Sequence, residues 1–280
     1  MRNFRISLIL LFLFQIAKTT AQISSNSPDV TLIEKYLQKS YQKYMEAINT
    51  DDRKTEEKFL KNLLTPEMNE KRARLTCVTD ANPMIRAQDV TEYGIQSVRF
   101  RHLSGNWYEM SYRSYPQDSA IYIPLRITTD SPEKIRISYV TPEWGDRQYG
   151  DHWFDIPEEK VIDDQDGKTF VETFYKSYAH TYIKMKQDLE QGLKHLRETY
   201  CTPAMQENYV RSRKELEPED PLFDPVIGND DFDVFWYNSL QIHPTENKEC
   251  FTVNYGYTKI LVTLQFQNGR YKIADVKVIS

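Results

Sequence analysis

The sequence predicts an α+β protein built from two similar halves, each with about three helices followed by a curved four-stranded antiparallel sheet. Two observations lead to this prediction. Short motifs recur in register between the halves, and in each half helical periodicity comes first and strand periodicity afterwards. Helices grouped before strands are typical of the α+β class, whereas α/β proteins alternate the two.

The repeat spans nearly the whole chain. Lys39-Ser40-Tyr41 recurs as Lys176-Ser177-Tyr178, 137 residues later, and Thr65-Pro66 recurs as Thr202-Pro203 at the same offset. Two matches in one register favour a tandem duplication over coincidence.

The first helix of each half carries one apolar stripe with spacings of four, four, four and three residues, which is typical of a helix face. A second helix is expected at about 53–64 and again at about 187–201. Thr65 and Thr202 each precede a proline, a combination that predicts an N-cap and the start of a third helix. The stripes consist of Ile33, Leu37, Tyr41, Met45 and Ile48 in the first half and of Phe170, Phe174, Tyr178, Tyr182 and Met185 in the second.

After the helices each half changes to apolar residues at every second position, which is typical of half-buried antiparallel strands. Asn268-Gly269 predicts a tight hairpin between the last two strands. The expected strands are 97–100, 108–112, 121–129 and 134–140, then 239–242, 251–255, 259–267 and 271–279.

Residues 142–167 predict a linker, because they are rich in Asp, Glu and Gly. The expected domains are therefore 30–141 and 168–280. Trp144, Trp153 and Phe154 lie inside the linker, so we expect it to pack on a domain.

The loop before the strands carries a family resemblance. In the first half it reads Asn82-Pro83-Met84-Ile85-Arg86-Ala87-Gln88-Asp89. A Thr-Pro helix followed by this loop resembles the bacterial envelope family called domain of unknown function 3828. The resemblance covers both halves and implies secretion and a nuclear transport factor 2-like fold, a sheet folded over helices into a cone; it implies no reaction. We align the second loop with Asp220-Pro221-Leu222-Phe223 and, after an insertion, with Asn229-Asp230-Asp231.

The first 21 residues predict a secretory signal peptide. Arg2 and Arg5 precede an apolar stretch at 6–14, and Thr19-Thr20-Ala21 supplies small residues before a cleavage site. The stretch is shorter than the roughly 20 residues that span a bilayer. We therefore expect a soluble protein, periplasmic or secreted, without membrane insertion after cleavage.

Charge and motifs exclude several classes of function. The net charge is −5, with 36 basic and 41 acidic side chains mixed along the chain, a pattern that disfavours a nucleic-acid partner. The sequence contains no His-Glu-x-x-His zinc motif, no Gly-x-Ser-x-Gly elbow and no phosphate-binding glycine loop. We predict no metal and no cofactor. Asn229-x-Asp231-x-Asp233 resembles the opening of a calcium loop, but Val234 stands where that loop needs glycine, so we expect a solvated acidic loop.

Two irregular stretches, 79–91 and 217–233, are the candidate binding loops, because loops on a rigid scaffold commonly carry function. The second stretch is acidic, so we expect it to be the contact if the partner is cationic. Asp89 and Asp231 could each act as a general base inside a cone pocket, although Asp also commonly caps turns, and the sequence favours caps. The candidate binding residues are Asn82, Pro83, Asp89, Asp220, Asp230, Asp231 and Asp233.

Cys201 and Cys250 could form a disulfide in an exported chain. Against this, Cys201 takes the place of the core residue Leu64, and Cys250 lies on the strand face opposite Phe251. This geometry makes pairing awkward, and both states stay open.

The sequence favours an exported non-catalytic binding protein that engages a protein partner or a small ligand, for example in the manner of an immunity protein. The alternative is a cone-pocket hydrolase or isomerase with an Asp as general base. A closed cavity that holds an ionisable pair would favour the enzyme, and a filled cone would favour the binding protein.

Overall fold

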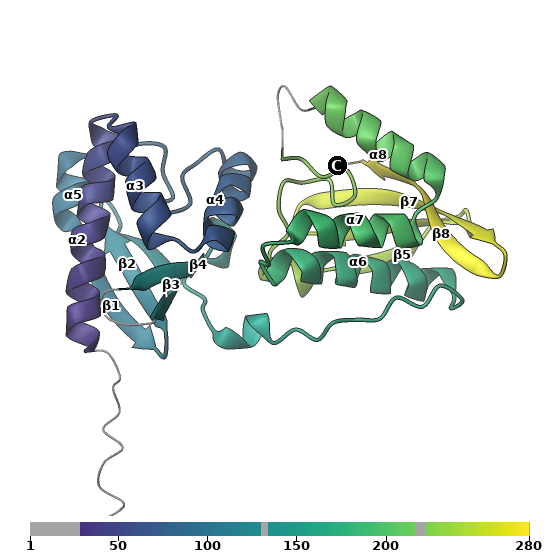
Figure 1. Cartoon of the computed structure of the whole chain (residues 1–280), viewed down its shortest axis with the longest axis horizontal. Coiled ribbons are helices and arrows are strands. Elements are labelled where there is room, and N and C mark those ends of the chain that lie inside the picture. Colours follow the sequence, from purple (N-terminus) through teal and green to yellow (C-terminus); the bar gives the residue numbers. More distant parts are fainter. Residues whose placement is uncertain (1–28, 130–133, 217–221, 280) are drawn as a thin grey trace, which may run out of the picture.

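The computed structural model describes residues 29–129, 134–216 and 222–279. The fold is α+β, with two four-stranded antiparallel sheets in two halves that lie side by side (Figure 1). The predicted signal peptide lies outside the described residues. Among the residues that are described, no helix is both long and apolar enough to cross a lipid bilayer.

The two halves have the same order of elements. The first half contains α2 (Val30–Asn49), α3 (Arg53–Leu63), α4 (Pro66–Thr79), α5 (Glu92–Ser97), β1 (Arg99–Ser104), β2 (Trp107–Tyr112), β3 (Ile121–Thr129) and β4 (Ile135–Val140). The second contains α6 (Gly167–Ile183), α7 (Leu189–Tyr200), α8 (Pro203–Leu216), α9 (Val234–Tyr237), β5 (Gln241–Pro244), β6 (Cys250–Tyr255), β7 (Thr258–Gln267) and β8 (Arg270–Val278). The short helices α5 and α9 directly follow the stretches 79–91 and 217–233 that the sequence predicts as irregular, and neither helix is among the predicted elements.

Local signals explain where the elements begin and turn. Thr65 Oγ1 accepts a hydrogen bond from Met68 N at 3.2 Å and so caps α4, and Thr202 caps α8 in the same way; both predicted caps are confirmed.

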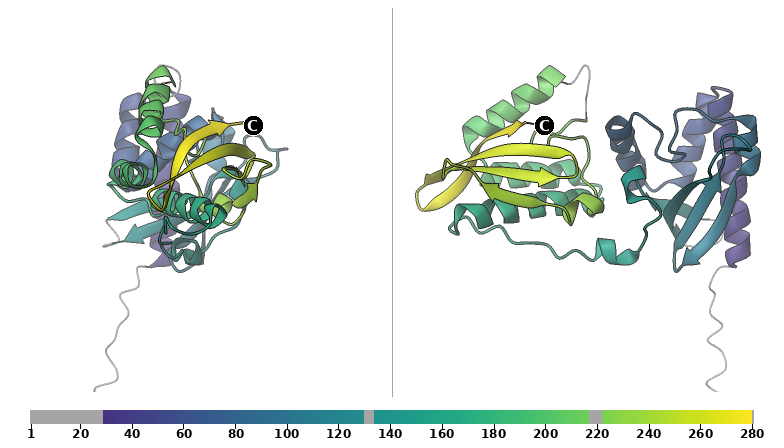
Figure 2. Two further views of the ribbon diagram at one scale, coloured as in Figure 1. Left: turned by 90° about the vertical axis from the view of Figure 1, so that its right-hand side faces the viewer. Right: turned by 180° about the vertical axis from the view of Figure 1, so that it is seen from behind.

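Each sheet is a meander, in the order β1-β2-β3-β4 and β5-β6-β7-β8 (Figure 2). Asn268 and Gly269 both adopt positive φ, 52° and 76°, as the predicted hairpin turn requires.

The helices fill the interior of each half. The apolar stripe of α2 packs with Tyr108, Met110 and Tyr112 of β2 in one buried cluster, and the stripe of α6 packs in the same manner with β6 and β7. Tyr41 and Tyr178, at corresponding places in the two stripes, are both fully buried. The interior of each half is therefore closed by side chains at its centre.

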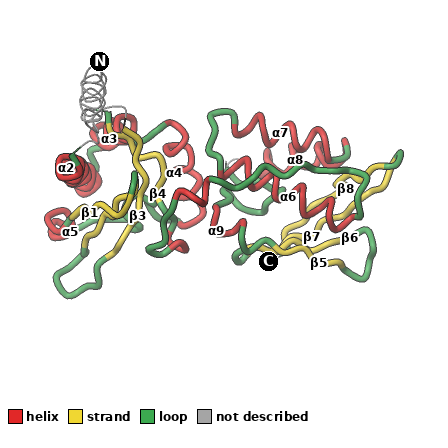
Figure 3. Tube along the Cα trace, turned by 90° about the horizontal axis from the view of Figure 1, so that it is seen from below, coloured by secondary structure: helices red, strands yellow, loops and turns green. Residues whose placement is uncertain are grey.

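The segment between the halves packs on both of them, as predicted. It contains two short 3-10 helices, η1 (Glu143–Gly145) and η2 (Asp151–Phe154). Trp153 meets Trp107 on the outer face of the first sheet, with ring centroids 5.7 Å apart, and Trp144 stacks on Trp236 of α9 at 4.4 Å. The segment then runs along α6 toward the start of that helix (Figure 3). On the way, Ser177 Oγ in the second half of α6 donates to the carbonyl of Glu159 at 2.6 Å.

The disulfide between Cys201 and Cys250 does not form. Cys201 is buried next to Ile273 of β8, on the helix side of the sheet. Cys250 instead stands opposite Thr263 of β7, and its Sγ lies 3.6 Å from the Thr263 hydroxyl. Because the two thiols belong to different faces of the sheet, they stay apart.

Candidate functional site

Helix α4 presents two basic side chains to the second half of the chain. The Thr65 cap and Pro66 fix the start of the helix, and Lys71 and Arg74 then fall one turn apart on one face. Lys71 is 1% exposed and Arg74 8%. Burial of two cations requires counter-charges nearby.

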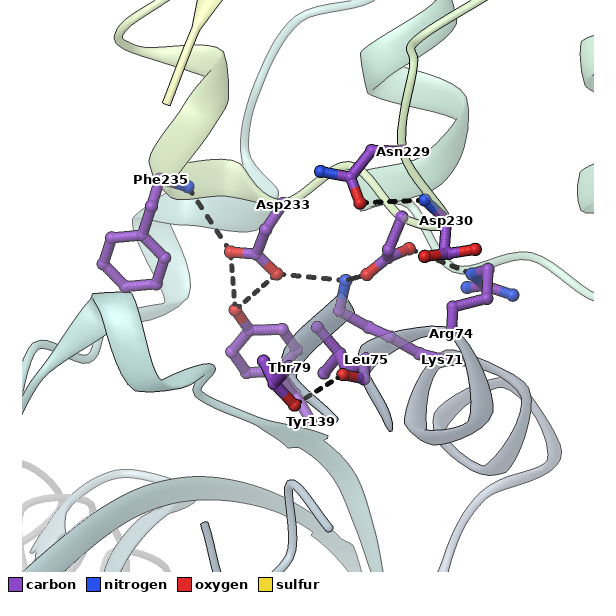
Figure 4. A network of polar contacts seen from close by, with 10 residues as sticks. Lys71, Arg74, Leu75, Thr79, Tyr139, Asn229, Asp230, Asp233 and Phe235 are labelled. Atoms are coloured by element: carbon purple, nitrogen blue, oxygen red, sulfur yellow. Dashed lines mark hydrogen bonds and ion pairs between the residues drawn. The ribbon is translucent and has the colours of Figure 1, made fainter. Parts of the chain in front are cut away.

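The counter-charges come from the stretch that leads into α9. Lys71 Nζ contacts Asp231 Oδ2 and lies 3.0 Å from Asp233 Oδ2, while Arg74 Nε donates to Asp231 Oδ1 at 2.9 Å (Figure 4). Asp231 and Asp233 are 0% and 1% exposed. Two cations and two carboxylates thus balance inside a dry junction between the halves, which we call the junction cluster (Lys71, Arg74, Tyr139, Asp231 and Asp233).

Tyr139 of β4 completes the junction cluster. Its hydroxyl donates to both carboxylate oxygens of Asp233 at 3.1 Å. Burial, together with the charge of Asp233, raises the pKa of Tyr139 well above its ordinary value. The phenol therefore keeps its proton and remains a donor.

The charge state of Lys71 follows from its partners. Burial lowers the pKa of Lys71, but the charges of Asp231 and Asp233 raise it by more, so that the net pKa lies above the ordinary value. In its resting state the side chain is an ammonium ion paired with two carboxylates.

The prediction of a solvated acidic loop is wrong. Asp230, Asp231 and Asp233 are all buried, and the cations that the last two meet belong to α4 of the same chain. Asp233 also caps α9, since its Oδ1 accepts from Phe235 N at 3.4 Å. Asp220 lies outside the described residues.

The candidate residues of the first loop lie outside the junction cluster and differ in their burial. Asn82 Nδ2 donates to the Tyr44 hydroxyl at 2.6 Å, Pro83 is buried, and Asp89 is exposed. The two predicted general bases are therefore far from equivalent, because Asp89 faces solvent and Asp231 is held by Lys71 and Arg74. Neither arrangement places a carboxylate inside a cone pocket.

The structure corrects the alignment of the second loop. Asn82 N donates to the carbonyl of Ala87 at 3.0 Å, and Asp224 N donates to the carbonyl of Asn229 at 2.9 Å. The counterpart of the first loop is therefore Asp224-Pro225-Val226-Ile227-Gly228-Asn229-Asp230-Asp231, without an insertion, rather than a loop that starts at Asp220.

A second buried carboxylate lies close to the junction cluster. Asp224 Oδ2 accepts hydrogen bonds from the hydroxyls of Tyr178 and Tyr182, both at 2.9 Å, and Arg197 donates to the Tyr178 hydroxyl at 2.6 Å. Burial raises the pKa of Asp224, although Arg197 opposes the shift. The sequence did not predict this network. The tyrosines of the α6 stripe could have indicated it, because buried hydroxyls need hydrogen-bond partners.

A cleft of about 400 Å³ opens between the halves beside these two groups. Its walls combine apolar side chains with acidic, basic and phenolic groups, so that it could hold a small polar ligand with an apolar part. The first half contributes Glu70, Ala73 and Arg74, and the second contributes Tyr182, Gln187, Leu189, Glu190, Leu193, Tyr209, Arg213, Leu222 and Asp224. Within the described ranges, no three His, Cys, Asp or Glu side chains are grouped to hold a metal ion.

Comparisons with known proteins give little further information. No family model and no curated protein matches the chain. A crystal structure of a protein of unknown function from Bacteroides thetaiotaomicron VPI-5482 is 26% identical over 49% of this chain and 99% of that chain, with a TM-score of 0.35.

Proposed function

We propose that the protein is an exported, non-catalytic binding protein that holds a small ligand in the cleft between its two halves. The observation that carries this proposal is the position of the cleft, whose walls come from α4 on one side and from α6, α7 and α8 on the other. Ligand sites occur preferentially at such junctions between domains.

The filled interiors support binding at the junction over catalysis inside a cone. Tyr41 and Tyr178 occupy the centres of the two halves. The two carboxylates considered as general bases are unsuited to that role, because Asp89 is exposed and Asp231 is paired with two cations.

We further propose that the halves are tandem copies of a nuclear transport factor 2-like domain of the family domain of unknown function 3828. The shared order of elements and strands supports this proposal. So does the shared hydrogen bonding of the loops that begin at Asn82 and Asp224.

The cleft is tested with a pair of matched variants. Ala73 lines the cleft from α4, whereas Val210 takes the corresponding position in α8 and is 52% exposed on the outside of the second half. Ala73→Trp should therefore fill the cleft, and Val210→Trp should leave it open. Because Val210 lines a separate pocket on α8, loss of the compound from Val210→Trp alone would place the ligand in that pocket.

The experiment incubates each purified protein with a small-molecule extract of the host envelope, and mass spectrometry then identifies what is retained. The wild type and Val210→Trp are expected to retain the same compound, and Ala73→Trp to lose it. Equal retention by all three proteins would place the ligand elsewhere. If none of the three proteins retains a compound, and all three capture the same protein from whole envelope extract, a protein interface outside the cleft would replace the small-ligand proposal.

A further inference from the structure

The contact between Lys71 and Asp231 joins an amine and a carboxyl group in a site buried from solvent. The two side chains are 1% and 0% exposed and come from α4 and from the stretch before α9, in different halves of the molecule (Figure 4). We propose that Lys71 and Asp231 condense spontaneously to a side-chain amide, an isopeptide bond that links the halves covalently.

Asp233 is placed to move the protons. Its Oδ2 lies 3.0 Å from Lys71 Nζ, within reach for a general base, and the Tyr139 hydroxyl holds both oxygens of this carboxylate in position. Because the resting amine is charged, the reaction begins when Nζ gives a proton to Asp233, which passes it to Oδ2 of Asp231, so that a neutral amine meets a neutral carboxylic acid. In a site of low dielectric this transfer converts two buried charges into two neutral groups.

Arg74 is placed to activate the electrophile. Its Nε donates to Asp231 Oδ1 at 2.9 Å, and this oxygen gains negative charge when the neutral amine attacks Cγ. A fixed, buried donor at such an oxygen stabilises the tetrahedral intermediate. The folded chain also holds the amine against the carboxyl group, which supplies the proximity that a reaction between free groups lacks.

The atoms and charges of the step balance. The Nζ–Cγ bond forms and the Cγ–Oδ2 bond breaks. Of the three protons on Nζ, one stays on the amide and two pass through Asp233 to Oδ2, which leaves as water, so that no oxidant or co-reactant is needed. The product retains Arg74 and Asp233 as one balanced pair. Condensation therefore removes one buried ion pair and its desolvation cost, and the exclusion of water protects the amide from hydrolysis.

The corresponding positions elsewhere in the chain lack these features. Asn208 stands in α8 where Lys71 stands in α4, and Asp89, the counterpart of Asp231, is exposed. The proposal is therefore specific to the junction, and Asp89 offers a matched control.

The test is the mass of the intact chain, measured in denaturant after prolonged incubation of the folded protein. The wild type is expected to weigh one water molecule less than its sequence, and a digest should contain a branched peptide that joins Lys71 to Asp231. Asp89→Asn should show the same loss of water. Asp231→Asn should lose one ammonia molecule instead, because the amide nitrogen is then the leaving group.

Lys71→Arg keeps the positive charge but should retain its full sequence mass. Asp233→Asn should also retain it, because the proton relay is gone. A wild-type mass equal to that of the sequence would overturn the proposal, whether or not any variant folds. A loss of water that persists in Lys71→Arg would also overturn it, because the water would then come from another site.

Discussion

Asn82 and Asp224 occupy the same position in two loops that share one pattern of hydrogen bonds. The side-chain Oδ1 of Asn82 accepts from Met84 N at 3.0 Å, and Oδ1 of Asp224 accepts from Val226 N at 2.8 Å. The chemical difference is the charge. The second half buries a carboxylate where the first half has a half-buried neutral amide.

Asp224→Asn is expected to fold normally and to change the pH dependence of stability. Since burial raises the folded-state pKa of Asp224 above its ordinary value of 3.8, the ionised form is less favourable in the folded than in the unfolded chain. The free energy of unfolding of the wild type, relative to the variant, should therefore fall as the pH rises above about 4. Urea unfolding at several pH values measures this difference, and a difference that does not change with pH would contradict the prediction.

Relative to wild-type chain that still has its full sequence mass, Lys71→Ala should destabilise the protein by about 3–5 kcal/mol, because it leaves two buried carboxylates with Arg74 as their remaining cation. Asn208→Ala, at the corresponding position of α8, should change stability by less than about 0.5 kcal/mol. Equilibrium unfolding in urea measures both. Equal effects would show that the junction cluster contributes little to stability.

Trp236→Ala should loosen the segment between the halves. The substitution removes the ring that stacks on Trp144 at 4.4 Å, and loss of such a large buried side chain costs about 3–5 kcal/mol. Limited proteolysis should then cut faster between residues 148 and 167. Tyr257→Ala is the control, since that side chain is fully exposed, and equal cutting of the two variants would contradict the prediction.

Gly228→Ala should destabilise the protein more than Gly269→Ala. Both glycines have positive φ, 64° and 76°, but a Cβ at Gly228 would lie 2.6 Å from Val278 Cγ2, whereas a Cβ at Gly269 meets no atom within 4 Å. Backbone strain alone costs about 1 kcal/mol or more, and the contact with Val278 adds to it only at Gly228. Thermal unfolding of the two variants isolates the second effect.

The elements could be predicted from the sequence where the signals are local. The Thr65 and Thr202 caps and the Asn268-Gly269 turn each act over a few residues, and the structure has them where expected. The second loop was misaligned because Asp-Pro occurs twice, at 220 and at 224. The correct alignment could have been found from Ile227, because Ile227 precedes Asp231 by the same number of residues as Ile85 precedes Asp89.

The junction cluster could not be predicted, because its partners are 160 residues apart. On the sequence alone, Lys71 and Arg74 look like solvated residues of a polar helix. The acidic stretch before α9 did indicate the need for a cation, but it could not show that the cation comes from the same chain.

The composition of the junction also limits how many halves can be joined. The outward face of α8 carries Asn208 where α4 carries Lys71, and Thr91 stands in the first half where Asp233 stands in the second. A copy placed after the second half would therefore meet Asn208 in place of the amine. A copy placed before the first half would meet Thr91 in place of the second carboxylate. Head-to-tail contacts that repeat without closing build fibres, and these two replacements mean that the junction cluster cannot be repeated with a further copy.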